Sequence, residues 1–154
     1  MVQRLFMKVE IDQSGKIEDT NRLTVVAYAN GISRSLMITS KDKKSVQTIF
    51  RKIGQPRVFI SKVFAAAILL LIENDYRKID TIIIDNEYPG HEKTIKRYLG
   101  EYIDRAGLVS ERVNIYFRSI GKKSKAHDAA WKAFRRKRSD IKASAKEIMR
   151  IIFY

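Results

Sequence analysis

The chain has 154 residues, of which 45% are hydrophobic, and it carries no cysteine and a formal net charge of +14. A chain of this length buries roughly 70% of the surface that its unfolded form exposes, which argues against whole-chain disorder and predicts one domain over residues 1–154. The absence of cysteine excludes disulfides, thiolate metal sites and a cysteine nucleophile, and it favours a reducing, cytoplasmic setting.

Membrane insertion is not expected from the distribution of apolar residues. The N-terminal sequence MVQRLFMKVEID lacks the long apolar stretch of a secretory signal. The longest apolar run, residues 63–72, is too short for a bilayer span, which needs about 20 residues. This run therefore predicts a helix buried in a globular core, and no membrane partner is expected.

The positive charge is concentrated near the C-terminus. Residues 118–150 hold twelve Lys or Arg against three acids, which is a net +9. Nucleic acid is the usual polyanionic partner of such a domain, because each neutralised phosphate releases counterions. The alternative is a solvated, lysine-rich surface of a heat-adapted protein. We expect a nucleic-acid partner.

The first third of the chain predicts three consecutive antiparallel strands. Residues 4–12 alternate between apolar and polar side chains, with the period of two that is typical of a strand. Residues 23–30 are β-branched and aromatic, and residues 32–40 form a third strand. Asn30-Gly31 between them is a strong hairpin signal, because both residues tolerate positive φ.

Helices and strands alternate in the rest of the chain. Apolar residues at helical spacing predict helices over about 46–53, 59–74 and 95–106. The continuously apolar residues 80–85 predict a central strand, and residues 113–119 predict a fifth. A basic helical segment follows over about 124–154, with a break near Ser139. The order β-β-β-α-β-α-β-α predicts an α/β fold with a five-stranded mixed sheet and helices on both faces.

Acidic residues stand at comparable places along this pattern. Asp12 ends the first strand, Asp85 ends the fourth with Glu87 two residues on, and Asp128 lies early in the helix after the fifth strand. If the first and fourth strands are neighbours, their carboxylates converge, and Asp128 reaches them from the helix alongside. Clustered carboxylates repel one another unless a cation lies among them, and ligands that are all oxygen favour Mg²⁺ or Mn²⁺.

This order of elements and acids resembles the ribonuclease H-like superfamily over almost the whole chain, and within it the RuvC-like Holliday-junction resolvases. SKAHDAAWKAF (124–134) is similar in style to the region around the final aspartate of that group. Classical ribonuclease H has a glutamate early in its first helix, whereas residues 46–53 contain no acid. The resemblance implies phosphodiester hydrolysis with two Mg²⁺ or Mn²⁺ ions, held by Asp12, by Asp85 or Glu87, and by Asp128.

Each of these residues also has a purely structural interpretation. Asp12 and Asp85 are of a type common in turns after strands, and Asp128 is favoured in a first helical turn by the helix dipole. Next to the acids, His127 is a candidate to orient the attacking water or contact phosphate. Lys125 is a candidate to stabilise charge in the transition state.

The residues expected to contact nucleic acid lie in the basic C-terminal segment. They are Lys122, Lys123, Lys132, Arg135, Arg136, Lys137 and Arg138. Trp131 and Phe134 lie on the same helix, and core packing is a better interpretation for them than base stacking.

Two classes of function follow. The first is a metal-dependent endonuclease acting on structured nucleic acid, with junction or branched DNA favoured over RNA. The second is a non-catalytic nucleic-acid-binding protein, for example a ribonucleoprotein subunit. The resemblance also implies a homodimer, and the apolar C-terminal sequence IIFY is consistent with one, although this tail could equally fold back onto its own core.

Overall fold

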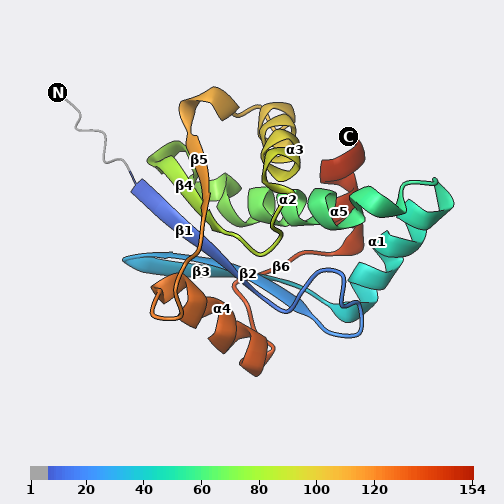
Figure 1. Ribbon diagram of the computed structural model, residues 1–154, viewed down its shortest axis with the longest axis horizontal. Coiled ribbons are helices and arrows are strands. Elements are labelled where there is room, and N and C mark those ends of the chain that lie inside the picture. Colours follow the sequence, from blue (N-terminus) through green and yellow to red (C-terminus); the bar gives the residue numbers. More distant parts are fainter. Residues whose placement is uncertain (1–6) are drawn as a thin grey trace.

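The computed structural model describes residues 7–154 and contains one six-stranded sheet with the order β5-β4-β1-β2-β3-β6 (Figure 1). The strands are β1 Met7–Ser14, β2 Thr24–Asn30, β3 Ile32–Ile38, β4 Ile79–Asp85, β5 Asn114–Arg118 and β6 Ile141–Lys142. The predicted mixed sheet is confirmed, but the predicted number of five strands is wrong. Residues 4–6 of the predicted first strand lie outside the described residues.

Local turns and crossovers determine how the strands pair. β1, β2 and β3 are antiparallel neighbours, and Gly31 between β2 and β3 has φ +68°, which a tight hairpin requires. β4 and β5 are parallel to β1, and such pairing needs crossover connections, which here contain helices. β6 contributes two residues that pair with β3, too short a strand for periodicity to reveal.

Helices cover both faces of the sheet, as predicted (Figure 1). They are α1 Ser40–Lys52, α2 Phe59–Ile72, α3 Glu92–Arg105, α4 Lys125–Arg136 and α5 Ala145–Phe153, with short 3-10 helices at Pro56–Val58, Glu73–Lys78 and Ser110–Arg112. Helix α1 begins earlier than its apolar spacing predicts, because Thr39 caps it by accepting a hydrogen bond from the backbone N–H of Asp42.

The larger core lies between the sheet and helices α1, α2, α3 and α5. Nearly every residue of α2 is buried, which confirms the prediction of a buried apolar helix. Within residues 7–154, none of the helices is long and apolar enough to cross a membrane. Helix α4 packs alone on the opposite face, against β1, β2 and β3, through the alanines at 126, 130 and 133.

The C-terminal segment is two helices separated by β6, so the predicted break is confirmed. Lys137 ends α4 in the left-handed conformation (φ 53°), and Ser144 with Glu147 forms a capping box that begins α5. In α5, Ile152 is 5% exposed and Phe153 packs on Phe50 at a ring-centroid distance of 5.7 Å. Part of the apolar tail therefore packs on the core of its own chain, while Phe153 is 39% and Tyr154 is 89% exposed, and the homodimer stays a prediction.

Candidate metal centre

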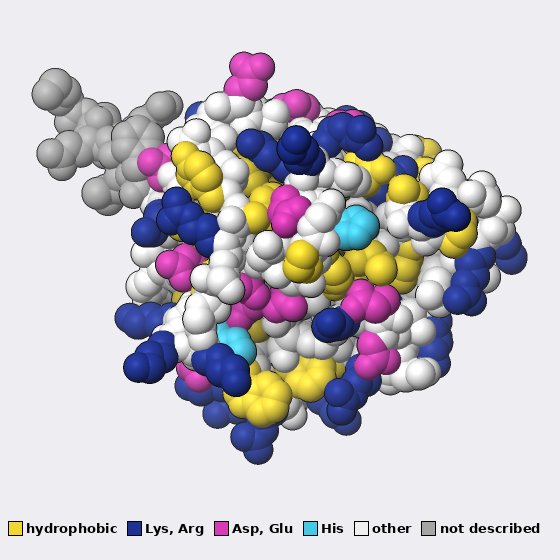
Figure 2. Space-filling model, viewed as in Figure 1, with side chains coloured by type: hydrophobic (Ala, Val, Ile, Leu, Met, Phe, Trp, Pro, Cys, Tyr) yellow, Lys and Arg dark blue, Asp and Glu magenta, His cyan; other side chains and the backbone are white. Residues whose placement is uncertain are grey.

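Three carboxylates converge where β4 ends beside β1. Asp12 lies within β1, which continues to Ser14, so the prediction that Asp12 ends the first strand is wrong. One carboxylate oxygen each from Asp12, Asp85 and Glu87 lies within 4.8 Å of the others. β1 and β4 are parallel neighbours with Ile11 opposite Ile84, so the next residue of each strand reaches the same edge and the same face of the sheet. Figure 2 shows acidic side chains grouped near the middle of the side of the molecule that faces the viewer, with Lys and Arg around them.

Hydrogen bonds hold the two aspartates of β1 and β4 in place. Asp12 is 2% exposed, and its Oδ1 accepts from the backbone N–H of Gln13 at 2.8 Å. Asp85 Oδ1 accepts from the backbone N–H of Ile120 at 2.7 Å, which ties the end of β4 to the loop after β5. Both carboxylates are therefore oriented before any ligand arrives.

The electrostatics of the site disfavour three negative charges together. Burial raises the pKa of Asp12, and its hydrogen bonds from Gln13 and His127 only partly oppose this. The pKa of Glu87 is raised to about 7, first by burial, then by the hydrogen bond and charge of Asp85 and the charge of Asp12. A cation among these oxygens would remove the repulsion, and a set of ligands that are all oxygen suits Mg²⁺ or Mn²⁺.

Helix α4 brings a histidine, and not its neighbouring aspartate, to the carboxylates. His127 Nδ1 lies 2.8 Å from Asp12 Oδ2. At the start of α4, the Ser124 hydroxyl caps the helix and donates to Glu10 at 3.3 Å, which ties this end of the helix to β1. The sequence therefore placed His127 correctly beside the acids.

The predicted ligand Asp128 does not join the group. Its carboxylate pairs with Lys132 Nζ at 3.0 Å, and its side chain is 58% exposed. Lys125 is exposed and lines a surface hollow with Asp128 and Lys132, beside the β2–β3 hairpin. Consecutive residues of a helix point about 100° apart, so docking that directs His127 to Asp12 directs Asp128 and Lys125 to the other flank.

The predicted nucleic-acid contacts are at the surface. Lys122, Lys123, Lys132 and the run Arg135–Arg138 are all exposed. Phe134 packs partly buried on the smaller core, as expected. Trp131 is 47% exposed, so the prediction that it anchors the core is wrong. It stacks on Phe134 with a centroid distance of 6.3 Å and an interplanar angle of 14°.

Two residues that support the site carried no signal in the sequence. The Tyr88 hydroxyl contacts the Gln13 side-chain amide at 2.9 Å and accepts from the backbone N–H of Ile17 at 3.1 Å. This links the residue after Glu87 to the end of β1. Lys16, in the loop after β1, lowers the pKa of Glu87 and so partly offsets the effect of the neighbouring carboxylates on that pKa. Both contacts join distant segments, and only the tertiary structure could reveal them.

Comparison of the chain with family models, curated proteins and solved structures returned no match. What the site can do must therefore be derived from its own chemistry. Three carboxylates at one sheet edge, with a histidine on one of them and an exposed basic surface nearby, could bind a divalent cation and present it to an anionic substrate.

Proposed function

We propose that the protein is a metal-dependent endonuclease of the ribonuclease H-like type, which hydrolyses phosphodiester bonds in nucleic acid. The observation that carries the proposal is the convergence of Asp12, Asp85 and Glu87 where β4 ends beside the parallel strand β1. The succession of elements and the adjacency of the first and fourth strands support the fold assignment. The short β6 is an addition to that pattern.

The residues present fit divalent cations. Asp12, Asp85 and Glu87 would hold Mg²⁺ or Mn²⁺, and a pair of ions is the arrangement that the resemblance implies. The chemistry that such ions supply is activation of water and stabilisation of charge on the reacting phosphate. In the hydrolysis, a water oxygen bonds to phosphorus, the bond from phosphorus to the 3′ oxygen breaks, and that oxygen takes a proton. The three carboxylates fit without Asp128.

The surrounding side chains orient the site and hold the substrate. Because His127 Nδ1 faces Asp12, the opposite nitrogen Nε2 is the one available to a phosphate, and the side chain is 39% exposed. Lys16 adds positive charge beside Glu87. The exposed basic residues of α4 and the preceding loop would neutralise backbone phosphates, which positions the substrate without reading its sequence.

Cleavage assays with matched variants test the proposal. Wild type should cut at least one of branched DNA, linear duplex, RNA–DNA hybrid and single strands with Mg²⁺ or Mn²⁺, and none with chelator. Branched DNA is the substrate that the resemblance favours. Asp12→Asn should abolish cleavage while leaving binding intact, whereas Asp128→Asn, which removes an acid one helical residue from His127, should cut like wild type.

The outcomes separate the two classes of function. If wild type cuts none of the substrates, or if Asp12→Asn cuts as fast as wild type, the enzyme proposal fails and a non-catalytic nucleic-acid-binding protein takes its place. If Asp128→Asn alone loses activity, the carboxylate set described above is the wrong one.

A further inference from the structure

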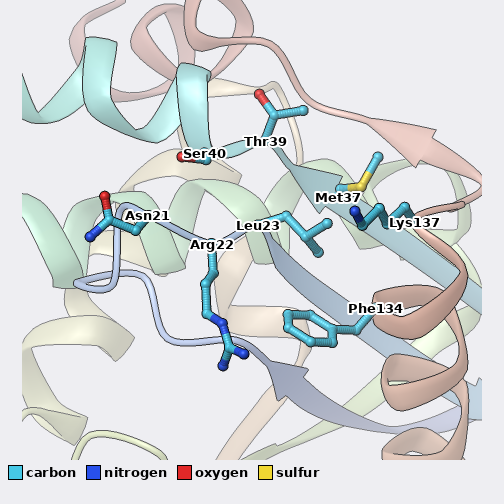
Figure 3. A pocket seen from close by; sticks show the side chains of 8 residues that line it. All are labelled: Asn21, Arg22, Leu23, Met37, Thr39, Ser40, Phe134 and Lys137. Atoms are coloured by element: carbon cyan, nitrogen blue, oxygen red, sulfur yellow. The ribbon is translucent and has the colours of Figure 1, made fainter.

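A pocket of about 530 Å³ lies on the same face of the sheet as the carboxylates, at the other end of α4. Its apolar wall is formed by Leu23, Met37 and Phe134, and Figure 3 shows Phe134 reaching from α4 toward the segment that carries Leu23. Arg22 and Lys137 stand at the rim, and within residues 7–154 neither forms an ion pair. The pocket therefore combines an apolar wall with two available cations.

One flank of α4 connects this pocket to the carboxylates. His127, Trp131 and Phe134 follow the i, i+4, i+7 spacing that places residues on one side of a helix. From His127 at the carboxylates to Lys137 at the pocket is ten residues, or about 15 Å along the helix axis. The flank between them carries the stacked rings of Trp131 and Phe134, with the Arg135 guanidinium 5.7 Å from the Trp131 ring centroid.

An exposed tryptophan beside a partly buried phenylalanine, with arginine and lysine around them, has the chemistry of a single-strand binding surface. Bases stack on aromatic rings without regard to sequence, and guanidinium and ammonium groups neutralise the backbone. A base paired within a duplex has both of its faces covered by neighbouring bases, so only an unpaired base can use these rings. The net charge of +14 supplies the complementary field for a polyanion.

We propose that this surface binds an unpaired strand of nucleic acid, with one base on Trp131 and an adjacent base in the pocket against Phe134. Arg22 and Lys137 contact its phosphates. The identity of this ligand rests on the proposed function. If both hold, the substrate is a nucleic acid that has an unpaired segment next to the site of cleavage.

Binding is measured in chelator, so that no cleavage interferes. Trp131 is the single tryptophan of the chain, so its fluorescence reports contact directly. A short oligothymidylate should quench it, and a long blunt duplex at equal nucleotide concentration, in which few bases have a free face, should quench it far less. By anisotropy of a labelled strand, Trp131→Ala should weaken binding roughly tenfold, which is the scale of one stacked base.

The charged rim is tested with a pair of double variants. Arg22→Ala with Lys137→Asn should weaken single-strand binding by roughly tenfold or more, the scale of charge-assisted hydrogen bonds. Asn at 137 tolerates the left-handed backbone, so α4 keeps its end. Lys93→Ala with Lys96→Ala removes the same charge from exposed positions of α3, on the opposite side of the sheet, and should change binding little.

Three results would overturn the proposal: equal quenching by duplex and single strand, no quenching at all, or equal losses in the two double variants. Its failure is distinct from failure of the nuclease proposal. Quenching by single strands together with no cleavage of any substrate would leave the binding surface in place and remove the enzyme. Cleavage without quenching would leave the enzyme proposal in place and remove the binding surface.

Discussion

Replacing Glu87 with glutamine should stabilise the metal-free protein. The pKa of Glu87 is raised from its ordinary 4.5 to about 7, by burial and by its two acidic neighbours. One pKa unit corresponds to about 1.4 kcal/mol, so ionising Glu87 costs roughly 2–3 kcal/mol once its partial exposure to water is allowed for. In chelator at pH 8, Glu87→Gln should therefore unfold about 4–12 °C above wild type.

The pH dependence has a definite sign. The folded pKa of Glu87 lies above its unfolded value, so its contribution to the free energy of unfolding is fully present below about pH 4.5 and is lost as the pH rises through about 7. The melting temperature of wild type in chelator should fall between pH 5 and pH 8. That fall should be smaller in Glu87→Gln. It should not vanish, because the pKa of Asp12 is also raised and Asp12 contributes to the fall in both proteins.

Metal should make wild type more stable than Glu87→Gln, which is the reverse of the order expected in chelator. At pH 8, Mg²⁺ or Mn²⁺ should raise the melting temperature of wild type, since a ligand that binds only the folded state stabilises it. Glu87→Gln should lose most of this gain. The control is Glu92→Gln, which removes an acid from the first turn of α3, where the pKa is lowered and the charge is therefore favourable. The control should not be more stable than wild type in chelator.

Differential scanning fluorimetry and urea unfolding across pH, with chelator or metal, provide the measurements. The reasoning is refuted if Glu87→Gln is no more stable than wild type in chelator at pH 8, or if metal stabilises both proteins equally.

Three further predictions concern the loop after β1 and the basic surface. Lys43→Met should cost roughly 1 kcal/mol or more in urea unfolding, because the carbonyls of Lys16 and Asp19 and the Thr24 hydroxyl lose the buried ammonium that donates to them. Burial lowers the pKa of Lys43 to about 8, so removing its charge offsets part of this loss, and a variant as stable as wild type would contradict the reasoning. Gly15→Ala should cost at least ~2 kcal/mol, because φ is +79° and the added Cβ would lie 2.3 Å from the Leu23 carbonyl oxygen. Gly54→Ala, also at positive φ but with nothing within 4 Å, should cost less, and equal losses would remove the steric argument. Duplex binding should weaken with salt at a log–log slope near roughly −5 if about six phosphates are neutralised, and a flat dependence would remove the electrostatic argument.

Local sequence determined much of the framework that carries the site. Alternation and continuous apolar runs predicted the two strands that carry Asp12, which lies within β1, and Asp85, which ends β4. The neighbouring, parallel placement of β1 and β4 then makes those acids converge whatever the details of packing. The buried character of α2 was predictable for the same reason, because a helix that is apolar all round has no face to present to water.

Only the tertiary structure decided which side chains of α4 face the carboxylates. Periodicity shows that a helix has an apolar stripe, but its rotation against the sheet depends on how the alanines at 126, 130 and 133 seat on β1, β2 and β3. That rotation brings His127 to Asp12, turns Asp128 to Lys132 and exposes Trp131. The raised pKa of Glu87 and the pairing of β6 with β3 likewise arise from contacts between residues far apart in the chain, which no local pattern contains.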